Sequence, residues 1–367
     1  MSGINPYTPV PPIPNDDKTI SGERAPPYHN DDNEDDAHYE DVDLTDLSQL
    51  NLNGKTVEDV TQELTKRIRE ILVLEDFSSQ ACAEHIYFIN SLCTMASDDA
   101  MFGDKLGSKL TKLRFVELSK EMWKKHLNAE LFKLNKNDLL WFSMITVRSI
   151  LWNMSDKSNR FCDRIIRTNF HSDIVKYLGS EHLKPEMFQE KPRQEVIQGF
   201  IGVLHNVVQR ASTAREALRK CKTVEVLQAF RECEHKMVSI RALMIQSYLV
   251  NEEENEKLNS NIETFEFLIN LLDGAIQGVT RFSVTLSVVE VLKAINNLAA
   301  NDMNKERIVQ VGALPYYVKL LQPDRKEEEQ KHAAHGLWIL GFLCQEDIKK
   351  EPGCIEGEHI LASAYNL

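Results

Sequence analysis

Two groups of side chains have residue types and spacings that could do chemistry. In the first, His332 and His335 follow Glu328 at short intervals, and two imidazoles with a carboxylate can ligate zinc. Helical zinc proteases, however, space their two histidines four residues apart, and the sequence offers no further ligand. We therefore expect no metal site here, only two partly solvated histidines on a helix.

The second group is Cys82 with His85, a thiol and an imidazole one helical turn apart. A cysteine nucleophile also needs donors that stabilise the oxyanion, and the sequence indicates none. The glycines of segment 103–107 lack the Gly-Lys-Ser/Thr ending of a phosphate-binding loop. The sequence thus predicts a protein that is not an enzyme, with no catalytic residues, no metal and no cofactor.

The elements that must position these residues are predicted to be helices. Apolar residues recur at three- and four-residue steps from about Thr56 to Gln345, as Val60, Leu64 and Ile68 illustrate. Segments with strand-like alternation are scarce. The seven cysteines are widely spaced, mostly in apolar stretches, so we expect buried, reduced thiols in an all-α body rather than a disulfide framework.

Six strongly apolar segments can be aligned as copies of one helix, at 86–97, 149–156, 202–209, 242–250, 293–302 and 335–342. Successive copies lie 41 to 62 residues apart, whereas armadillo and HEAT repeats have about 40–47 residues. The longest interval leaves room for an irregular unit at about 100–137. The spacing predicts a right-handed superhelical solenoid of armadillo/HEAT type, with roughly five to seven repeats.

The clearest unit lies in the last quarter of the sequence. Asn301 or Asp302 can cap a short helix there. Gly312 then permits a sharp turn, and Pro315 fits the first turn of the following helix. A long third helix is expected over 326–343. Short, medium and long helices around a glycine turn are typical of one armadillo repeat.

These residues carry a resemblance to a known family. The segments Val311–Pro315 and Gly336–Trp338 look like parts of an armadillo repeat. Over 312–357 the sequence is similar to armadillo arrays of invertebrate proteins that often have a C-terminal TIR domain and are linked to innate-immune signalling. The ten residues after Gly357 are too few for a TIR domain, so we do not expect TIR-type activity in this chain.

The aligned position holds an amide in three of the six helices, at Asn153, Asn206 and Asn297. The resemblance implies that such amides line a concave groove and bond the main chain of an extended peptide, since an amide both donates and accepts. Alternatively, they bond one repeat to the next. Trp152 and Trp338 complete the predicted protein-binding groove, although they do not occupy the position that importin-type arrays give to tryptophan.

Charge divides the chain into unlike parts. Residues 1–50 contain 12 acidic and 2 basic side chains, which accounts for most of the net charge of −13. Seven of the 12 prolines fall within the first 27 residues. Because proline and like charge disfavour a packed core, we expect a disordered Pro-rich, acidic tail over 1–52. An armadillo-like helical repeat domain then covers 53–350, and a C-terminal tail covers 351–367.

Two basic clusters are spaced so that each shares a helix face: Lys120, Lys124 and Lys125, and Arg160, Arg164 and Arg167. Each is either a solvated face or a docking site for an acidic segment, for which residues 31–46 of the same chain are the candidate. Salt would weaken such a contact.

The predicted function is a non-enzymatic protein–protein interaction scaffold, which the resemblance places in innate-immune-type signalling. An alternative, also by resemblance, is a regulator of a small GTPase. The expected partners are proteins or extended peptide segments, and not nucleic acid, because the chain is acidic. No run of 18 apolar residues and no signal-peptide pattern occurs, so we expect a cytoplasmic protein without a membrane span.

Overall fold

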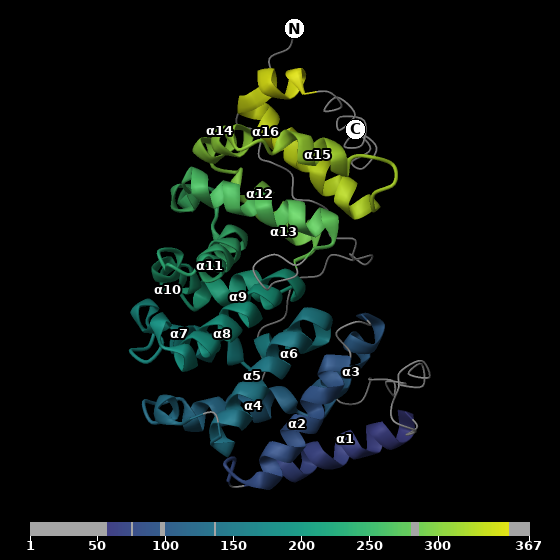
Figure 1. Cartoon of the computed structure of the whole chain (residues 1–367), viewed down its shortest axis with the longest axis vertical. Coiled ribbons are helices and arrows are strands. Elements are labelled where there is room, and N and C mark those ends of the chain that lie inside the picture. Colours follow the sequence, from purple (N-terminus) through teal and green to yellow (C-terminus); the bar gives the residue numbers. More distant parts are fainter. Residues whose placement is uncertain (1–56, 75, 96–99, 136, 280–285, 352–367) are drawn as a thin grey trace, which may run out of the picture.

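The structure is a computed structural model that describes residues 57–351, apart from 75, 96–99, 136 and 280–285. Helices stack in chain order along the long axis, from α1 at one end to α16 at the other (Figure 1). Within these residues there is no β-strand. The predicted all-α solenoid of armadillo/HEAT type is confirmed, whereas the predicted tail over 1–52 lies outside the described residues, as do 352–367.

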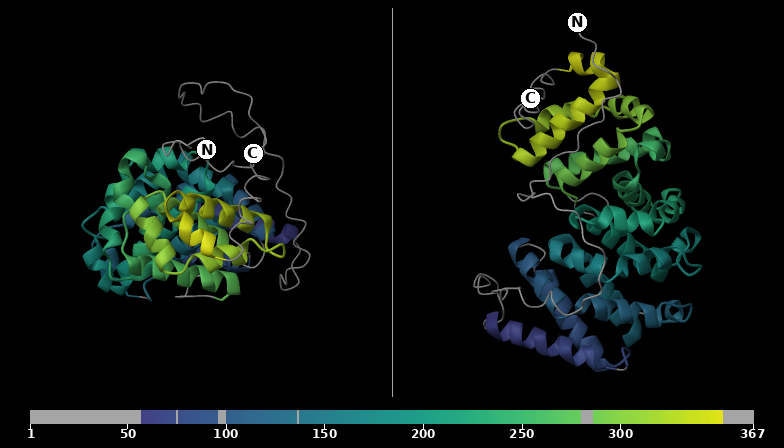
Figure 2. Two further views of the ribbon diagram at one scale, coloured as in Figure 1. Left: turned by 90° about the horizontal axis from the view of Figure 1, so that it is seen from above. Right: turned by 180° about the vertical axis from the view of Figure 1, so that it is seen from behind.

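One helix of each unit contacts its counterpart in the next unit along the chain, and Figure 2 shows the resulting stack from above and from behind. We call these helices the third helices: α2 (Gln80–Met95), α5 (Leu139–Lys157), α8 (Lys191–Arg210), α11 (Lys236–Leu249), α13 (Val288–Leu298) and α16 (Glu327–Lys350). Each of the six apolar segments that the sequence aligns overlaps a different one of these six helices, although 86–97, 242–250 and 293–302 extend past the end of theirs.

The remaining helices lie between successive third helices in the sequence. First helices are α3 (Ala100–Lys112), α6 (Asn159–Arg167), α9 (Ala214–Lys220) and α14 (Asp302–Gln310), with the 3₁₀ helix η6 (Glu252–Leu258) in the fourth unit. Second helices are α4 (Phe115–His126), α7 (Phe170–Leu178), α10 (Thr223–Arg231), α12 (Ile262–Gln277) and α15 (Leu314–Leu320). Five such units follow α1 (Val57–Leu72) and α2 within the described residues.

The segment 100–137 is more regular than the sequence suggested. It contains α3, α4 and the short 3₁₀ helix η4 (Leu131–Lys133), so it supplies the first two helices of an ordinary unit. A further 3₁₀ helix, η5 (Pro185–Gln189), precedes α8. The interval is long because of the connections around α3 and α4, not because the unit lacks a helix.

The last unit has the predicted order of helices. Asn301 is the N-cap residue of α14, and Pro315 lies in the first turn of α15. The third helix α16 extends beyond the predicted end at 343 and is kinked at Cys344, whose backbone angles (φ −105°, ψ 29°) are not helical. The core of the stack is apolar, and Trp123 and Tyr317 are among its fully buried side chains.

One backbone feature recurs at the corner between first and second helices. Arg114, Asn169, Lys222 and Gly312 all occupy this corner, with φ of 61°, 59°, 58° and 78°. This left-handed region suits glycine, since other residues carry a steric cost there. The corner therefore has one geometry in four units, although the sequence supplies a glycine in only one of them.

Exchanging residues at this corner is expected to change stability in opposite directions. Lys222 is exposed, so Lys222→Gly removes only the left-handed strain and should raise the free energy of unfolding by about 1 kcal/mol. Gly312→Ala should lower it by a similar amount. Urea unfolding measures both, and a loss of stability in Lys222→Gly would contradict this account.

Candidate protein-binding surface

One face of α5 carries side chains that are only partly buried, whereas residues 199–208 of α8 and 240–247 of α11, which continue the row of third helices, are buried. On α5 the stripe is Phe142, Ile145, Ser149, Trp152 and Asp156, at three- and four-residue steps, while Val147 and Ile150 behind it are fully buried. Contacts link this stripe to its neighbours: the rings of Tyr87 and Phe142 lie 6.3 Å apart across α2 and α5. We call this surface the third-helix face.

Trp152 lies at the centre of the third-helix face and spans three helices. It starts on α5 and lies against α8 at Gly202, where an added Cβ would be 2.6 Å from the indole. Its ring centroid is 4.7 Å from the guanidinium carbon of Arg241 on α11. The glycine at 202 thus provides the space that the indole needs.

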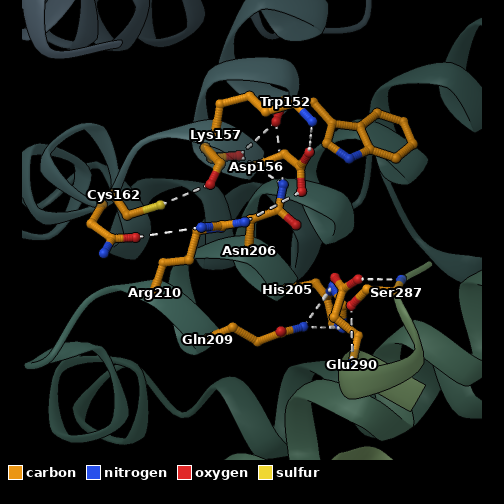
Figure 3. Close-up of polar contacts among 12 residues, drawn as sticks. Trp152, Asp156, Lys157, Cys162, His205, Asn206, Gln209, Arg210, Ser287 and Glu290 are labelled. Atoms are coloured by element: carbon orange, nitrogen blue, oxygen red, sulfur yellow. Dashed lines mark hydrogen bonds and ion pairs between the residues drawn. The ribbon is translucent and has the colours of Figure 1, made fainter. Parts of the chain in front are cut away.

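The three predicted asparagines have different surroundings. Asn206 is buried and donates to the backbone oxygen of Trp152 (3.2 Å) and to Ser155 Oγ (3.0 Å), so it connects α8 to α5 (Figure 3). Asn153 and Asn297 are partly buried. The sequence left two roles open for these amides, contact with a peptide or a hydrogen bond between repeats. Asn206 makes the hydrogen bonds that the second role requires.

A neighbouring amide, Asn296, makes a similar connection in the C-terminal half. Its Nδ2 donates to the backbone oxygen of His332 (2.8 Å), and its Oδ1 accepts from the Tyr317 hydroxyl (2.9 Å). Gly336 packs directly against both of these side chains. The three elements α13, α15 and α16 are therefore joined by one buried polar network.

Polar side chains continue the third-helix face beyond Trp152. Asp156 forms ion pairs with Lys157 (3.1 Å) and Arg210 (3.9 Å), and Gln209 donates to His205 (2.8 Å; Figure 3). His205 is almost fully buried, and burial, together with the nearby Arg241 charge, lowers its pKa to about 3. This histidine is neutral at physiological pH.

Trp338 lies in an aromatic cluster on α16. Its ring stacks on His335 (centroids 5.9 Å apart) and meets Phe342 edge-on (4.9 Å), and Phe342 is 44 % exposed. On the adjacent helix Lys293 pairs with Glu328 at 3.6 Å. The third-helix face therefore has aromatic groups at both ends and at its centre.

The expectation of two partly solvated histidines is wrong. His332 and His335 are buried, and desolvation lowers their pKa to about 3 and about 4. Nearby Lys293 also disfavours a charge on His332. Among the described residues, no group of three or more histidine, cysteine or carboxylate side chains could hold a metal ion.

Cys82 and His85 are engaged in packing and ion pairing. The Cys82 thiol is buried, and desolvation raises its pKa to about 11, which makes it a poor nucleophile. His85 instead contacts Glu70 (3.2 Å) and Arg67 (3.3 Å). The six described cysteines carry free thiols.

Members of both predicted basic clusters connect helices of the stack. Lys120 on α4 pairs with Asp173 on α7 (3.4 Å) and donates to the backbone oxygen of Thr168. Arg164 on α6 donates to Glu117 on α4 at 3.0 Å through Nε. Lys124 and Lys125 line a shallow surface hollow with Leu74 and Phe77. These clusters are thus only partly available to a partner.

Sequence reasoning missed the residues that shape the centre of the third-helix face. Gly199 and Gly202 lie three residues apart on α8 and accommodate Arg148 and Trp152 of α5. Two glycines at helical spacing inside an apolar helix were the available signal, because glycine weakens a helix unless a close contact requires it. Arg241 gave no such signal, since its partner is distant in sequence.

None of the helices described here combines the length and apolar character that crossing a bilayer requires. No protein-family model matches the sequence, and no curated protein matches it. Among solved structures, the chain is similar to the designed armadillo repeat protein YIII(Dq)4CqI, with a TM-score of 0.45 and 18 % identity over 76 % of this chain and 99 % of that one. It is also similar to the designed armadillo repeat protein YIII(Dq.V1)4CPAF in complex with the peptide (KR)4, with a TM-score of 0.44 and 19 % identity over the same shares.

Proposed function

We propose that this chain is a non-enzymatic scaffold whose third-helix face binds an extended segment of another protein. The observation that carries the proposal is the row of six third helices, each in contact with the next, with aromatic groups at both ends and Trp152 at its centre. Tryptophan and arginine supply much of the energy in protein interfaces. Solenoids commonly use such extended surfaces for binding.

The amides of Asn153 and Asn297 suit the main chain of such a segment. Both are partly buried on third helices, and an amide can donate and accept at the same time. Trp152 and Trp338 would supply the apolar contacts on either side. The resemblance implies a cytoplasmic role, either in innate-immune-type signalling or in the regulation of a small GTPase. Each of these roles would need a surface that binds a protein partner.

The test begins with peptides selected on the full chain from a random display library. We expect Trp152→Ala and Trp338→Ala each to weaken binding of the selected peptides about tenfold or more, which is about 1.4 kcal/mol. The double variant Asn153→Ala/Asn297→Ala should weaken it less, because main-chain hydrogen bonds contribute about 1 kcal/mol each. Fluorescence anisotropy with labelled peptides measures the dissociation constants.

Matched controls lie on the second helices. Glu225 on α10 and Lys319 on α15 are exposed, so Glu225→Ala and Lys319→Ala should leave binding within about twofold. Thermal unfolding of every variant shows whether it is folded. Equal affinity in the third-helix variants and in these controls would refute the proposed function.

A further inference from the structure

Three side chains form a cluster at the centre of the third-helix face, and we call it the arginine–tryptophan cluster: Arg148, Trp152 and Arg241. Arg148 and Trp152 are one turn apart on α5 and lie against Gly199 and Gly202 of α8. Arg241 reaches Trp152 from α11, on the far side of α8. The Arg241 guanidinium thus lies over the indole, and Arg148 lies one helical turn from Trp152 on α5, where three consecutive repeats meet.

Both guanidinium groups lack a carboxylate partner within the described part of the chain. The Nε atoms of Arg148 and Arg241 are buried without a hydrogen-bond acceptor there. Arg241 is only 7 % exposed, and burial lowers its pKa to about 10, so it stays charged at neutral pH. A buried charge without an anion is costly, and an anion at this point would therefore be stabilising.

Three acidic groups act electrostatically on the two arginines, Glu195 of α8 on Arg148, and Asp156 and Glu290 on Arg241, and the latter two are engaged elsewhere. Asp156 pairs with Lys157 and Arg210, and the Glu290 carboxylate accepts from the backbone nitrogen of Ser287 at 2.7 Å in a capping box. Both influence Arg241 only at a distance. Within the described residues, Arg241 therefore has no ion-pair partner, and Arg148 has only the electrostatic influence of Glu195.

We propose that residues 31–46 of this same chain occupy the arginine–tryptophan cluster, with their carboxylates on the two guanidinium groups. This inference rests on the proposed function, since it uses the same face. The segment contains nine acidic residues and no lysine or arginine. Arginine forks suit carboxylates because they can donate two parallel hydrogen bonds.

The connection to the helical body favours this segment over a separate acidic protein. Ten residues separate position 46 from Val57 at the start of α1. When fully extended, this linker spans about 3.3 Å per residue. A tethered segment reaches an effective concentration of about 1 mM. Any partner that uses this cluster must therefore displace the chain's own acidic segment.

The experiment uses a fluorescein-labelled peptide of residues 28–50 and four full-length chains. These are the natural chain, a tail-neutralised chain with the nine acidic residues of 31–46 changed to Asn or Gln, and two derivatives of the latter. One derivative carries Arg148→Gln and Arg241→Gln. The other carries Lys222→Gln and Lys319→Gln, which remove the same charge from exposed positions outside the third helices and outside both basic clusters.

We expect the peptide to bind the tail-neutralised chain about tenfold or more tightly than the natural chain, because the competing segment is gone. The arginine derivative should lose about tenfold in affinity, and the lysine derivative less than about twofold. Raising the salt concentration should weaken binding. If the arginine derivative does not fold, Arg241→Lys replaces it, since this change keeps the charge and removes the forked donor.

Two results would overturn the inference. One is equal affinity of the peptide for the natural and the tail-neutralised chains, which would leave the cluster to an external acidic partner. The other is equal loss in the arginine and lysine derivatives. Neither result would refute the proposed function, because that function is tested with peptides selected from a random library. Those peptides can still depend on Trp152 and Trp338 for binding when the acidic segment does not bind.

Discussion

Lowering the pH from 7.5 to 5 is expected to reduce the free energy of unfolding by about 4–6 kcal/mol, because three of the four histidines buried in the described part of the chain, His205, His332 and His335, are held strongly in their neutral form. The pKa values of His205 and His332 are lowered to about 3, and that of His335 to about 4, from the usual 6.5. Above pH 6.5 both folded and unfolded chains carry neutral histidines, so nothing is lost there.

Below pH 6.5 the unfolded chain binds protons that the folded chain does not accept until the pH approaches 3 to 4. Within this window each histidine therefore lowers the free energy of unfolding by up to about 1.4 kcal/mol per pH unit. At pH 5 the loss amounts to about 2 kcal/mol for each histidine. Carboxylates contribute little at pH 5. Glu254, for example, has its pKa lowered to about 2 by hydrogen bonds from Lys257 and Arg219, so its stabilising effect is lost only in stronger acid.

Urea unfolding at several pH values measures this dependence. The variant His332→Gln/His335→Gln should show a markedly shallower slope between pH 7 and 5 than the natural chain. Constant stability from pH 7.5 to 5.5 in the natural chain would mean that these histidines are not held neutral by burial.

Gly336→Ala is expected to destabilise the C-terminal unit by about 3 kcal/mol. A Cβ at this position would collide with the buried Tyr317 ring and with Asn296 Oδ1. These two groups hydrogen-bond each other, so moving either one leaves a buried polar atom without its partner. Overpacking and a lost buried hydrogen bond each cost about 1–3 kcal/mol, which outweighs the gain of about 1 kcal/mol from replacing glycine in a helix.

Gly341 on the same helix provides the matched control. The nearest atom to an added Cβ there is Ile348 Cδ1 at 4.0 Å, so Gly341→Ala meets no obstruction and should stabilise the chain by up to about 1 kcal/mol. Thermal or urea unfolding compares the two variants directly. Equal effects of the two alanines would show that Gly336 is not required by close packing.

The sequence by itself determined the helices and their repetition. Apolar residues such as Val60, Leu64 and Ile68 identify the buried face of α1, and all three are buried. The same periodicity placed the six third helices, and Gly312 predicted one corner between helices. These features are local, because they depend on residues a few positions apart. The relation to TIR-bearing proteins and the domain boundaries stay predictions.

Only the tertiary structure decided which neighbours each exposed or polar residue meets. Asn206 could have faced a peptide, but its amide bonds to α5. Periodicity also could not show that Lys222 adopts the backbone of a glycine, nor that Gly202 makes room for Trp152. The arginine–tryptophan cluster joins residues about 90 positions apart. Such contacts depend on how repeats pack against each other, and a helical pattern specifies which face is buried but not what covers it.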